Sequence, residues 1–268
     1  MNRPPLILGT FLLLALTVGA ADVPPSTAQN LWVNPKDGME FVWVPPATKD
    51  ANGALAGGPT AAEAEITNGF WLGRTEVTIA QFRRFTTATG YVTDAEKATN
   101  RWTWIKPGFT QADNHPVVWL SWNDALGYAR WAGVGLPTET EWLHACRAGT
   151  TSRFFCGDTV ADDFVWHRGN ASNGTQPVAT RRPNAWGLYD LLGSAYEWCR
   201  LEERYGAGEG AAGYPRGSSW TRCPDRFSYD LPIVGGPRYG VIVYDDDRGF
   251  RCLRRGEGPA AGVGNPAR

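Results

Sequence analysis

The pattern of apolar and polar positions divides the chain into short elements separated by long irregular stretches. Residues 39–44 alternate as a strand does, and two prolines end the run. Residues 70–74 predict a second short strand. After residues 75–78, apolar side chains recur at helical spacing, which indicates a helix with one face toward the core. Those side chains are Ile79, Phe82 and Phe85.

Capping residues predict two further helices. Ser121 stands at the start of the helical pattern of residues 121–131, where its hydroxyl can accept a hydrogen bond from a free backbone amide. Thr138 and Glu141 form a capping box, which predicts a helix over residues 138–147. These signals indicate where helices begin and say nothing about catalysis.

The remaining stretches have little periodicity. Residues 115–120 predict a buried strand, whereas residues 91–114 predict a loop and residues 184–198 a loop with a short strand. Residues 201–215 are rich in Gly and Glu and predict an insertion. With 32 Gly, 19 Pro and 13 Trp in 268 residues, the composition favours many turns and short elements. No linker is evident, so we expect a single domain.

The N-terminus has the pattern of a secretory signal peptide at residues 1–21. Arg3 precedes an apolar run over residues 6–18, and small residues follow. The alternative, a retained anchor helix, is disfavoured because the run is shorter than the ~20 residues that a membrane span needs. We expect a secreted, periplasmic or cell-surface protein with no membrane span after signal removal. Residues 22–37 predict a tether, and residues 256–268 a disordered tail.

Charge and cysteine content narrow the classes of function. A formal net charge of −1 gives no electrostatic reason to expect nucleic acid or an anionic membrane as a partner. In an oxidising compartment, five cysteines can form up to two disulfides with one thiol left over, and the sequence does not fix the pairing. The cysteines are Cys146, Cys156, Cys199, Cys223 and Cys252.

Oxygen donors are the better candidates for a metal site. The three histidines lack partners at metal-ligand spacing, and the sequence has no phosphate loop or nucleophile elbow. Carboxylates and free backbone carbonyls in irregular loops bind hard cations. One such set could form a calcium site and consists of Asp190, Gly193, Ala195 and Glu197.

Residues 221–247, called the recognition segment below, lie between two compact motifs and have neither a strand nor a helix period. The segment holds three Gly, three Pro and a closing acidic triplet. Its Arg, Tyr and branched apolar residues are typical of interfaces when they lie on solvent-facing loops, although packing into the domain's own core is the alternative. The predicted ligand-binding residues are Thr221, Arg222, Cys223, Asp225, Arg226, Tyr229, Asp230, Ile233, Val234, Arg238, Tyr239, Val241, Ile242, Tyr244 and Asp245.

Residues 38–255 resemble the formylglycine-generating enzyme (sulfatase-modifying factor) family, because short motifs occur in the order seen there. The resemblance implies a single α+β domain of low regular content, a variant of the C-type lectin fold with its ligand or active site in the C-terminal loops. The motifs are Met39–Phe41, Leu72–Thr78, His115–Val117, Ser121–Ala125, Leu136–Trp142, Asn184–Asp190, Glu197-Trp198, Arg216–Trp220 and Gly249–Arg251.

The resemblance also implies calcium at the four candidate residues above, and it bears on catalysis. The family's enzymes oxidise a sulfatase cysteine with copper and oxygen, using two cysteines with four residues between them. Here Cys223 lies one position later than the family pattern places the first of these cysteines, and Ser228 occupies the position of the second. One thiolate does not give the two-sulfur coordination that suits Cu(I). A Cys146–Cys252 bond is left open, because a usual partner position is Ala129.

A second group with this fold, the variable proteins of diversity-generating retroelements, resembles the chain in the recognition segment. Randomising the adenines of an Asn codon never gives Glu, Lys, Met, Gln or Trp. The recognition segment has none of these five types, which make up 35 of the 268 residues. Independent sampling gives that outcome about 2% of the time, an estimate from composition alone.

The leading hypothesis is a secreted, non-catalytic protein that binds a protein or other macromolecule through the recognition segment. The alternatives are a copper-dependent oxidase that converts a sulfatase cysteine to formylglycine, and an accessory substrate-binding domain of the kind fused to iron-dependent sulfoxide synthases.

Overall fold

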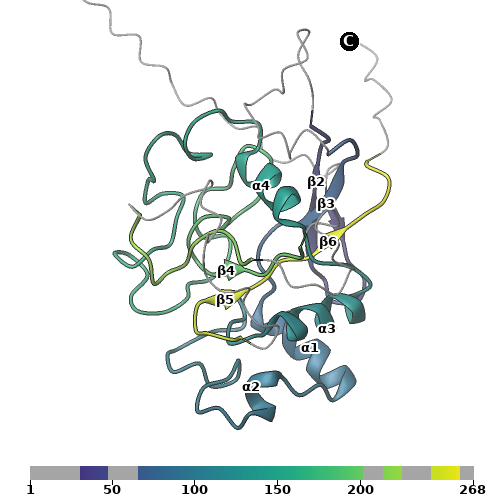
Figure 1. Ribbon diagram of the computed structural model, residues 1–268, viewed down its shortest axis with the longest axis vertical. Helices are drawn as coiled ribbons and strands as arrows, with labels where there is room; N and C mark the ends of the chain where they lie inside the picture. Colours follow the sequence, from purple (N-terminus) through teal and green to yellow (C-terminus); the bar gives the residue numbers. More distant parts are fainter. Residues whose placement is uncertain (1–30, 48–65, 202–213, 225–242, 260–268) are drawn as a thin grey trace, which may run out of the picture.

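The computed structural model describes residues 31–47, 66–201, 214–224 and 243–259 (Figure 1). Helices and strands account for a minority of these residues, and long irregular segments join them. None of the helices in these ranges is long and apolar enough to cross a membrane. The predicted signal peptide lies outside the described residues.

The main sheet has four short antiparallel strands: β1 (Leu31–Val33), β2 (Glu40–Val44), β3 (Phe70–Gly73) and β6 (Leu253–Arg254). Their order is β1-β2-β3-β6. β2 and β3 are the two predicted strands, whereas β6 comes from the other end of the domain and pairs with β3. A second, parallel pair joins β4 (Tyr196–Glu197) to β5 (Arg248–Gly249). The sheets therefore tie the C-terminal motifs to the rest of the domain.

The helices are α1 (Ile79–Thr89), α2 (Asp94–Lys97), α3 (Trp122–Ala132) and α4 (Glu139–Arg147). Ser121 and Thr138 cap α3 and α4 as predicted, each accepting a hydrogen bond from the amide three residues on. Thr78 caps α1 in the same way. Figure 1 shows α1 and α3 together on one side of the sheet region and α4 on another.

The main sheet carries a hydrophobic core on each face. Phe41 and Trp71 point into one cluster, where Phe82 of α1 and Tyr128 of α3 stack at 5.9 Å between ring centroids. Val42 and the other inward residues of the opposite face pack with α4. Because both faces are covered, β2 and β3 are apolar at successive positions.

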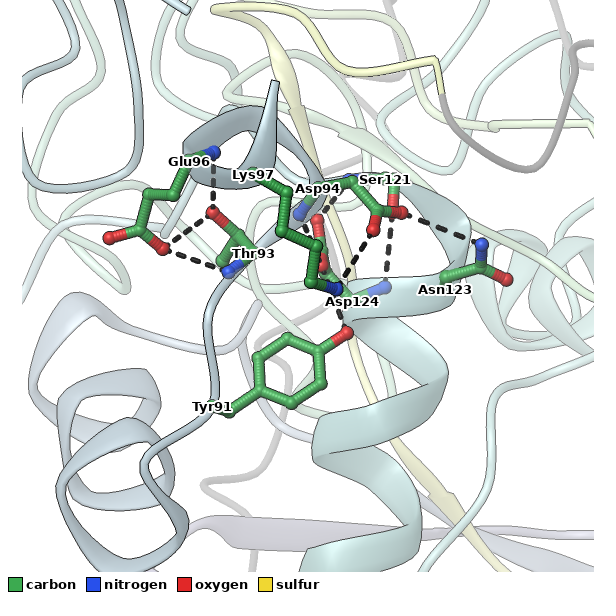
Figure 2. A network of polar contacts seen from close by, with 8 residues as sticks. All are labelled: Tyr91, Thr93, Asp94, Glu96, Lys97, Ser121, Asn123 and Asp124. Carbon is green, nitrogen blue, oxygen red and sulfur yellow. Dashed lines mark hydrogen bonds and ion pairs between the residues drawn. The ribbon is translucent and has the colours of Figure 1, made fainter. Parts of the chain in front are cut away.

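A polar network fixes α2 to the start of α3 (Figure 2). Asp124 Oδ1 accepts hydrogen bonds from Tyr91 Oη at 3.0 Å and from the backbone amide of Asp94 at 3.1 Å. Ser121 Oγ donates to Asp94 Oδ2 at 2.6 Å, and Lys97 pairs with the same carboxylate. Each helix start therefore contacts a carboxylate of the other: Asp124 at the start of α3 accepts from α2, and Asp94 at the start of α2 accepts from Ser121.

Two sequence predictions of secondary structure are wrong in part. Residues 115–120 are mostly buried but form no strand, because Trp119 has a left-handed φ of 63° and only one bridge, between Thr78 and Pro116, forms. The predicted loop 91–114 contains α2, whose capping box begins at Thr93.

The predicted tether, residues 22–37, is also corrected over its described part. β1 lies within it, and Asp37 is buried, where it accepts a 2.6 Å hydrogen bond from Tyr128 Oη. At the other end, Trp71 Nε1 donates to the carbonyl oxygen of Glu257 at 3.0 Å, so the domain continues into the predicted tail. Long-range pairing, which composition does not report, orders the described parts of both stretches, residues 31–37 and 256–259.

Candidate functional site

A buried ion pair joins Glu197 and Arg251. Arg251 Nε and Nη2 donate to Glu197 Oε2 and Oε1, both at 2.6 Å, and neither side chain is exposed. Trp142 Nε1 also donates to Oε2 at 2.6 Å. The guanidinium is held further by the carbonyl oxygens of Gly73 and Tyr189. This pair therefore connects β4, α4, β3 and the C-terminal motif.

Two more buried carboxylates, Glu76 and Asp190, interact with this pair. Glu76 Oε1 accepts a 3.3 Å hydrogen bond from the amide of Ala195, whereas Glu76 Oε2 is buried without a partner in the described ranges. We call Glu76, Asp190 and Glu197 the carboxylate cluster. Its three carboxylates share one buried guanidinium, which leaves an excess of negative charge when all three are ionised.

The pKa values follow from that excess. Burial raises the pKa of Glu76 well above its ordinary range, and Asp190 and Glu197 add to the rise. Burial likewise raises the pKa of Asp190 to about 6. For Arg251, burial opposes the charge but Glu197 outweighs it, so the pKa of Arg251 is raised. A cation bound here would relieve the repulsion that disfavours the ionised carboxylates.

The donors fit a hard cation in their chemistry. A carboxylate offers about four lone-pair sites, and Glu197 uses three of them for Arg251 and Trp142. Glu76 Oε2 has no hydrogen-bond partner of ordinary geometry in the described ranges, although the nearby Ser194 hydroxyl partly offsets the rise in the pKa of Glu76. The three carboxylates of the cluster are not all within 4.8 Å of one another, so backbone carbonyls would complete the set.

The four predicted calcium residues lie on one short stretch of chain, which supplies two members of the cluster, Asp190 and Glu197. Asp190 and Gly193 both have a left-handed backbone, with φ of 58° and 76°. Asp190 Oδ2 accepts from the amide of Ala179 at 2.7 Å. Sequence reasoning missed Glu76. The available signal was a charged residue next to the buried Val77, directly before a helix cap.

The two described ends of the recognition segment meet at Asp247. Its Oδ2 accepts hydrogen bonds from Ser219 Oγ and Thr221 Oγ1, both at 2.8 Å. Trp220 Nε1 donates to the carbonyl oxygen of Asp246 at 3.3 Å. The amide of Trp119 donates to the carbonyl oxygen of Asp245 at 2.9 Å. The motifs on either side therefore hold the segment's ends together on the scaffold.

The acidic triplet Asp245, Asp246 and Asp247 is the group in the described residues whose carboxylates all lie within 4.8 Å of one another. Burial raises the pKa of Asp246 to about 6, and the charges of Asp247 and Asp245 add to the rise. Because Asp247 is already engaged by two hydroxyl groups, the triplet has a clear structural role in closing the segment.

The structure describes five of the predicted ligand-binding residues. Arg222 and Cys223 are exposed. Thr221, which precedes them, is half-buried, and so is Tyr244 near the other end of the segment. Asp245 lies in the triplet. The other predicted residues lie outside the described ranges: Asp225, Arg226, Tyr229, Asp230, Ile233, Val234, Arg238, Tyr239, Val241 and Ile242.

All five cysteines lie within the described ranges, and no disulfide joins any two of them. Cys146 and Cys252 are buried in different core clusters, so the direct bond between them that the family resemblance left open is wrong. Burial raises the pKa of Cys252 and of Cys199 well above the ordinary thiol range. Buried thiols of this kind are inert.

The architecture is a single mixed domain with little regular secondary structure, as predicted. PvdO from Pseudomonas aeruginosa has a similar structure, with a TM-score of 0.58, 22% identity, and coverage of 86% of this chain and 98% of that one. Treponema denticola variable protein 1 gives a TM-score of 0.56 at 17% identity, over 84% of this chain and 98% of that one. These likenesses define the fold, which is consistent with the C-type lectin type.

Sequence defines the family. The chain belongs to the sulfatase-modifying factor enzyme 1-like domain family, FGE-sulfatase, whose match spans residues 28–256. It is 32% identical over 260 residues to a Streptomyces coelicolor protein named formylglycine-generating enzyme, covering 75% of this chain and 82% of that one. It is also 32% identical over 181 residues to a Bos taurus protein named inactive C-alpha-formylglycine-generating enzyme 2, covering 59% of this chain and 54% of that one.

Proposed function

We propose that this chain is a ligand-binding member of its family, without oxidase activity, and that the recognition segment contacts a macromolecular partner. The observation that carries the proposal is the position of Cys223. Its thiol is exposed at the start of the segment, and Ser228 stands in the sequence where the resemblance to the family's oxidases calls for a second cysteine.

The remaining thiols are held elsewhere. Cys146, Cys199 and Cys252 are buried among core side chains. Cys156 is half-buried, and its Sγ donates a hydrogen bond to the carbonyl oxygen of Thr159 at 3.7 Å. Cu(I) favours sulfur ligands. These four cysteines do not supply a second thiolate beside the exposed Cys223. The relative named as inactive supports the view that members of this family need not be catalysts.

The scaffold supports a display role. Asp247 locks the two ends of the recognition segment together, while Arg222 and Cys223 are exposed where the segment leaves the scaffold. Loops fixed at their ends on a rigid frame are common binding surfaces. The absence of five residue types from the segment further supports a diversified surface.

Calcium is proposed as a structural cofactor at the carboxylate cluster and the carbonyls of Gly193 and Ala195. The unpartnered Glu76 Oε2 and the excess of buried carboxylates support it. When bound, the ion would supply the positive charge that Arg251 alone does not. Export, with removal of residues 1–21, is proposed from the signal-peptide pattern.

Copper titration and oxygen uptake with a Cys-Thr-Pro-Ser-Arg sulfatase peptide test the non-catalytic assignment. We expect no turnover by the wild-type protein, because it lacks the second sulfur ligand. Cys156→Ser is the matched control for loss of a thiol away from the segment. Turnover that disappears in Cys223→Ser and persists in Cys156→Ser would replace this proposal with the oxidase alternative.

The diversified surface has a genomic test. We expect a nearby template copy of the 3′ coding sequence that differs at adenines alone, with a reverse transcriptase gene beside it. If sequencing of the locus finds neither, the retroelement origin is wrong, while the non-catalytic assignment is still decided by the copper and oxygen measurements.

A further inference from the structure

A pocket of about 380 Å³ is lined by residues of α3, of the segment that follows it and of β6. None of its lining residues belongs to the recognition segment or to the carboxylate cluster. Four arginines line it, and no acidic residue does. They are Arg130, Arg200, Arg254 and Arg255. This concentration of one charge is unusual in a chain with a net charge of −1.

Backbone hydrogen bonds fix the walls of the pocket. The amide of Gly135 donates to the carbonyl oxygen of Leu253 at 2.8 Å, and the amide of Leu253 donates back to Gly135 at the same distance. The amide of Arg200 donates to the carbonyl oxygen of Pro137 at 2.9 Å. The segment after α3 is thus held between β6 and Arg200, three residues after the end of β4. Arg200, Arg254 and Arg255 therefore lie on backbone that these hydrogen bonds fix, or within two residues of it.

Two of the four guanidinium groups, those of Arg130 and Arg254, are not neutralised by a carboxylate of the described ranges. Arg255 pairs with Glu141 at 2.5 Å, and Arg254 lies over the ring of Trp32 at 4.4 Å, a contact that orients it without cancelling its charge. Within the described ranges, no carboxylate lies at ion-pair distance from the guanidinium of Arg130 or Arg254. The pocket is left with a net positive charge.

An unpaired donor adjoins these charges. Trp122 lines the pocket and is 1% exposed, and its Nε1 has no hydrogen-bond acceptor among the described residues. A buried indole N–H usually has a partner, but this one is covered, so the arginines are the charged groups that a ligand in the pocket can reach. The rest of the lining is apolar and includes Leu126, Val134, Leu136 and Leu253. The pocket therefore offers charge on one part of its lining and an apolar surface on another.

We propose that this pocket binds a small organic phosphate or sulfate ester, with the tetrahedral oxyanion held by the arginines and the organic group on the leucines. Guanidinium groups match such oxyanions with forked, charge-assisted hydrogen bonds. Guanidinium groups supplied by more than one element suit a group with three free oxygens better than a carboxylate with two. The pocket volume lies at the lower end of the range for small-molecule sites, so the pocket suits a small molecule and not a protein partner.

Isothermal calorimetry on the full chain tests the proposal with four probes: phenyl phosphate, phenyl sulfate, benzoate and phenol. We expect one ester to bind with a stoichiometry of one, and its affinity to fall as salt rises. The stronger of the two esters identifies the source of the oxyanion. Undetectable binding of both esters at millimolar concentration overturns the proposal, and so does benzoate or phenol binding as tightly as either ester.

Substitutions locate the binding. Arg130→Ala and Arg254→Ala should each weaken ester binding about tenfold, the effect of losing one charge-assisted contact. Arg101→Ala is the matched control, since Arg101 is exposed and lies over Trp102 at 4.5 Å, as Arg254 lies over Trp32. The control should leave affinity within about twofold, well below one such contact.

Two further results bear on the location of the site. Unchanged affinity in both Arg130→Ala and Arg254→Ala, with normal melting, overturns the proposal. Loss of binding in Arg222→Ala would also overturn it, because Arg222 lies in the recognition segment. Two pocket variants on different elements, α3 and β6, keep the test decisive if either one folds poorly.

Discussion

Arg251 and Glu197 form two charge-assisted hydrogen bonds of 2.6 Å with no exposure of either side chain. The parallel pairing of β4 with β5 brings them together, since Glu197 lies opposite Gly249, two residues before Arg251. The pair stands among two other buried carboxylates, Glu76 and Asp190. The arginine is therefore the positive charge on which this part of the core depends.

Arg251→Met should lower the free energy of unfolding by about 3–5 kcal/mol, because it leaves buried carboxylates without a cation. Urea unfolding followed by circular dichroism measures the change. The matched control is Arg83→Met, since Arg83 pairs with Asp113 on the surface, where both side chains are at least half exposed. That loss should be about 0–1 kcal/mol. Equal losses in the two variants would mean that the buried pair does not stabilise the fold.

Calcium should raise the melting temperature of the wild-type protein relative to chelator, because a ligand bound only to the native state stabilises it. Glu76→Gln should reduce that rise by at least half, since it neutralises the carboxylate with the unused buried oxygen. Glu40→Gln is the control, because Glu40 pairs with Arg74 at the surface and should leave the calcium effect intact. Identical melting in calcium and in chelator for the wild type would count against the calcium site.

Gly193→Ala should be far more costly than Gly90→Ala. Both glycines have positive φ, 76° and 68°, so both substitutions carry the left-handed strain of about 1 kcal/mol. A Cβ at Gly193 would lie 2.1 Å from the carbonyl oxygen of Trp166, whereas a Cβ at Gly90 meets nothing within 4 Å. We expect a loss of at least about 3 kcal/mol for Gly193→Ala, measured by urea unfolding. Similar losses of stability in the two variants would exclude the close approach of the Trp166 carbonyl oxygen as the reason that residue 193 is a glycine.

Asp246→Asn should make stability less dependent on pH. The pKa of Asp246 is raised to about 6 in the folded chain by burial, Asp247 and Asp245, against about 4 in an unfolded chain. The folded state thus binds the proton more tightly, so the contribution of Asp246 is fully present below about pH 4 and is lost as pH rises through about 6.

Melting temperatures between pH 4 and 7 in chelator measure that effect. The wild type should lose about 1–3 °C more than Asp246→Asn over this range, a small shift because the group is half-exposed and screened. Asp113→Asn, at the surface pair with Arg83, is the control. A wild-type profile that matches Asp246→Asn at every pH would show that the Asp246 carboxyl titrates normally.

The sequence by itself determined the local features of this protein. Capping residues such as Ser121 and Thr138 fix helix starts through hydrogen bonds to amides three residues away. The apolar spacing from Ile79 to Phe85 fixes the buried face of α1. Ordered motifs also pointed to the family, and with it the mixed fold of low regular content. The capping and spacing signals act within a few residues, and the motifs are recognised by their order along the chain, so no knowledge of the tertiary structure was needed.

The tertiary structure decided what depends on distant partners. β1 and β6 have too few residues to show a pattern and exist because β2 and β3 offer them hydrogen bonds. Glu76 becomes part of the cluster because the fold brings it to Asp190 and Glu197, far along the chain. The arginines of the α3–β6 pocket likewise meet only after Leu253 pairs with Gly135. Burial and charge balance are sums over such contacts, which a linear sequence does not reveal.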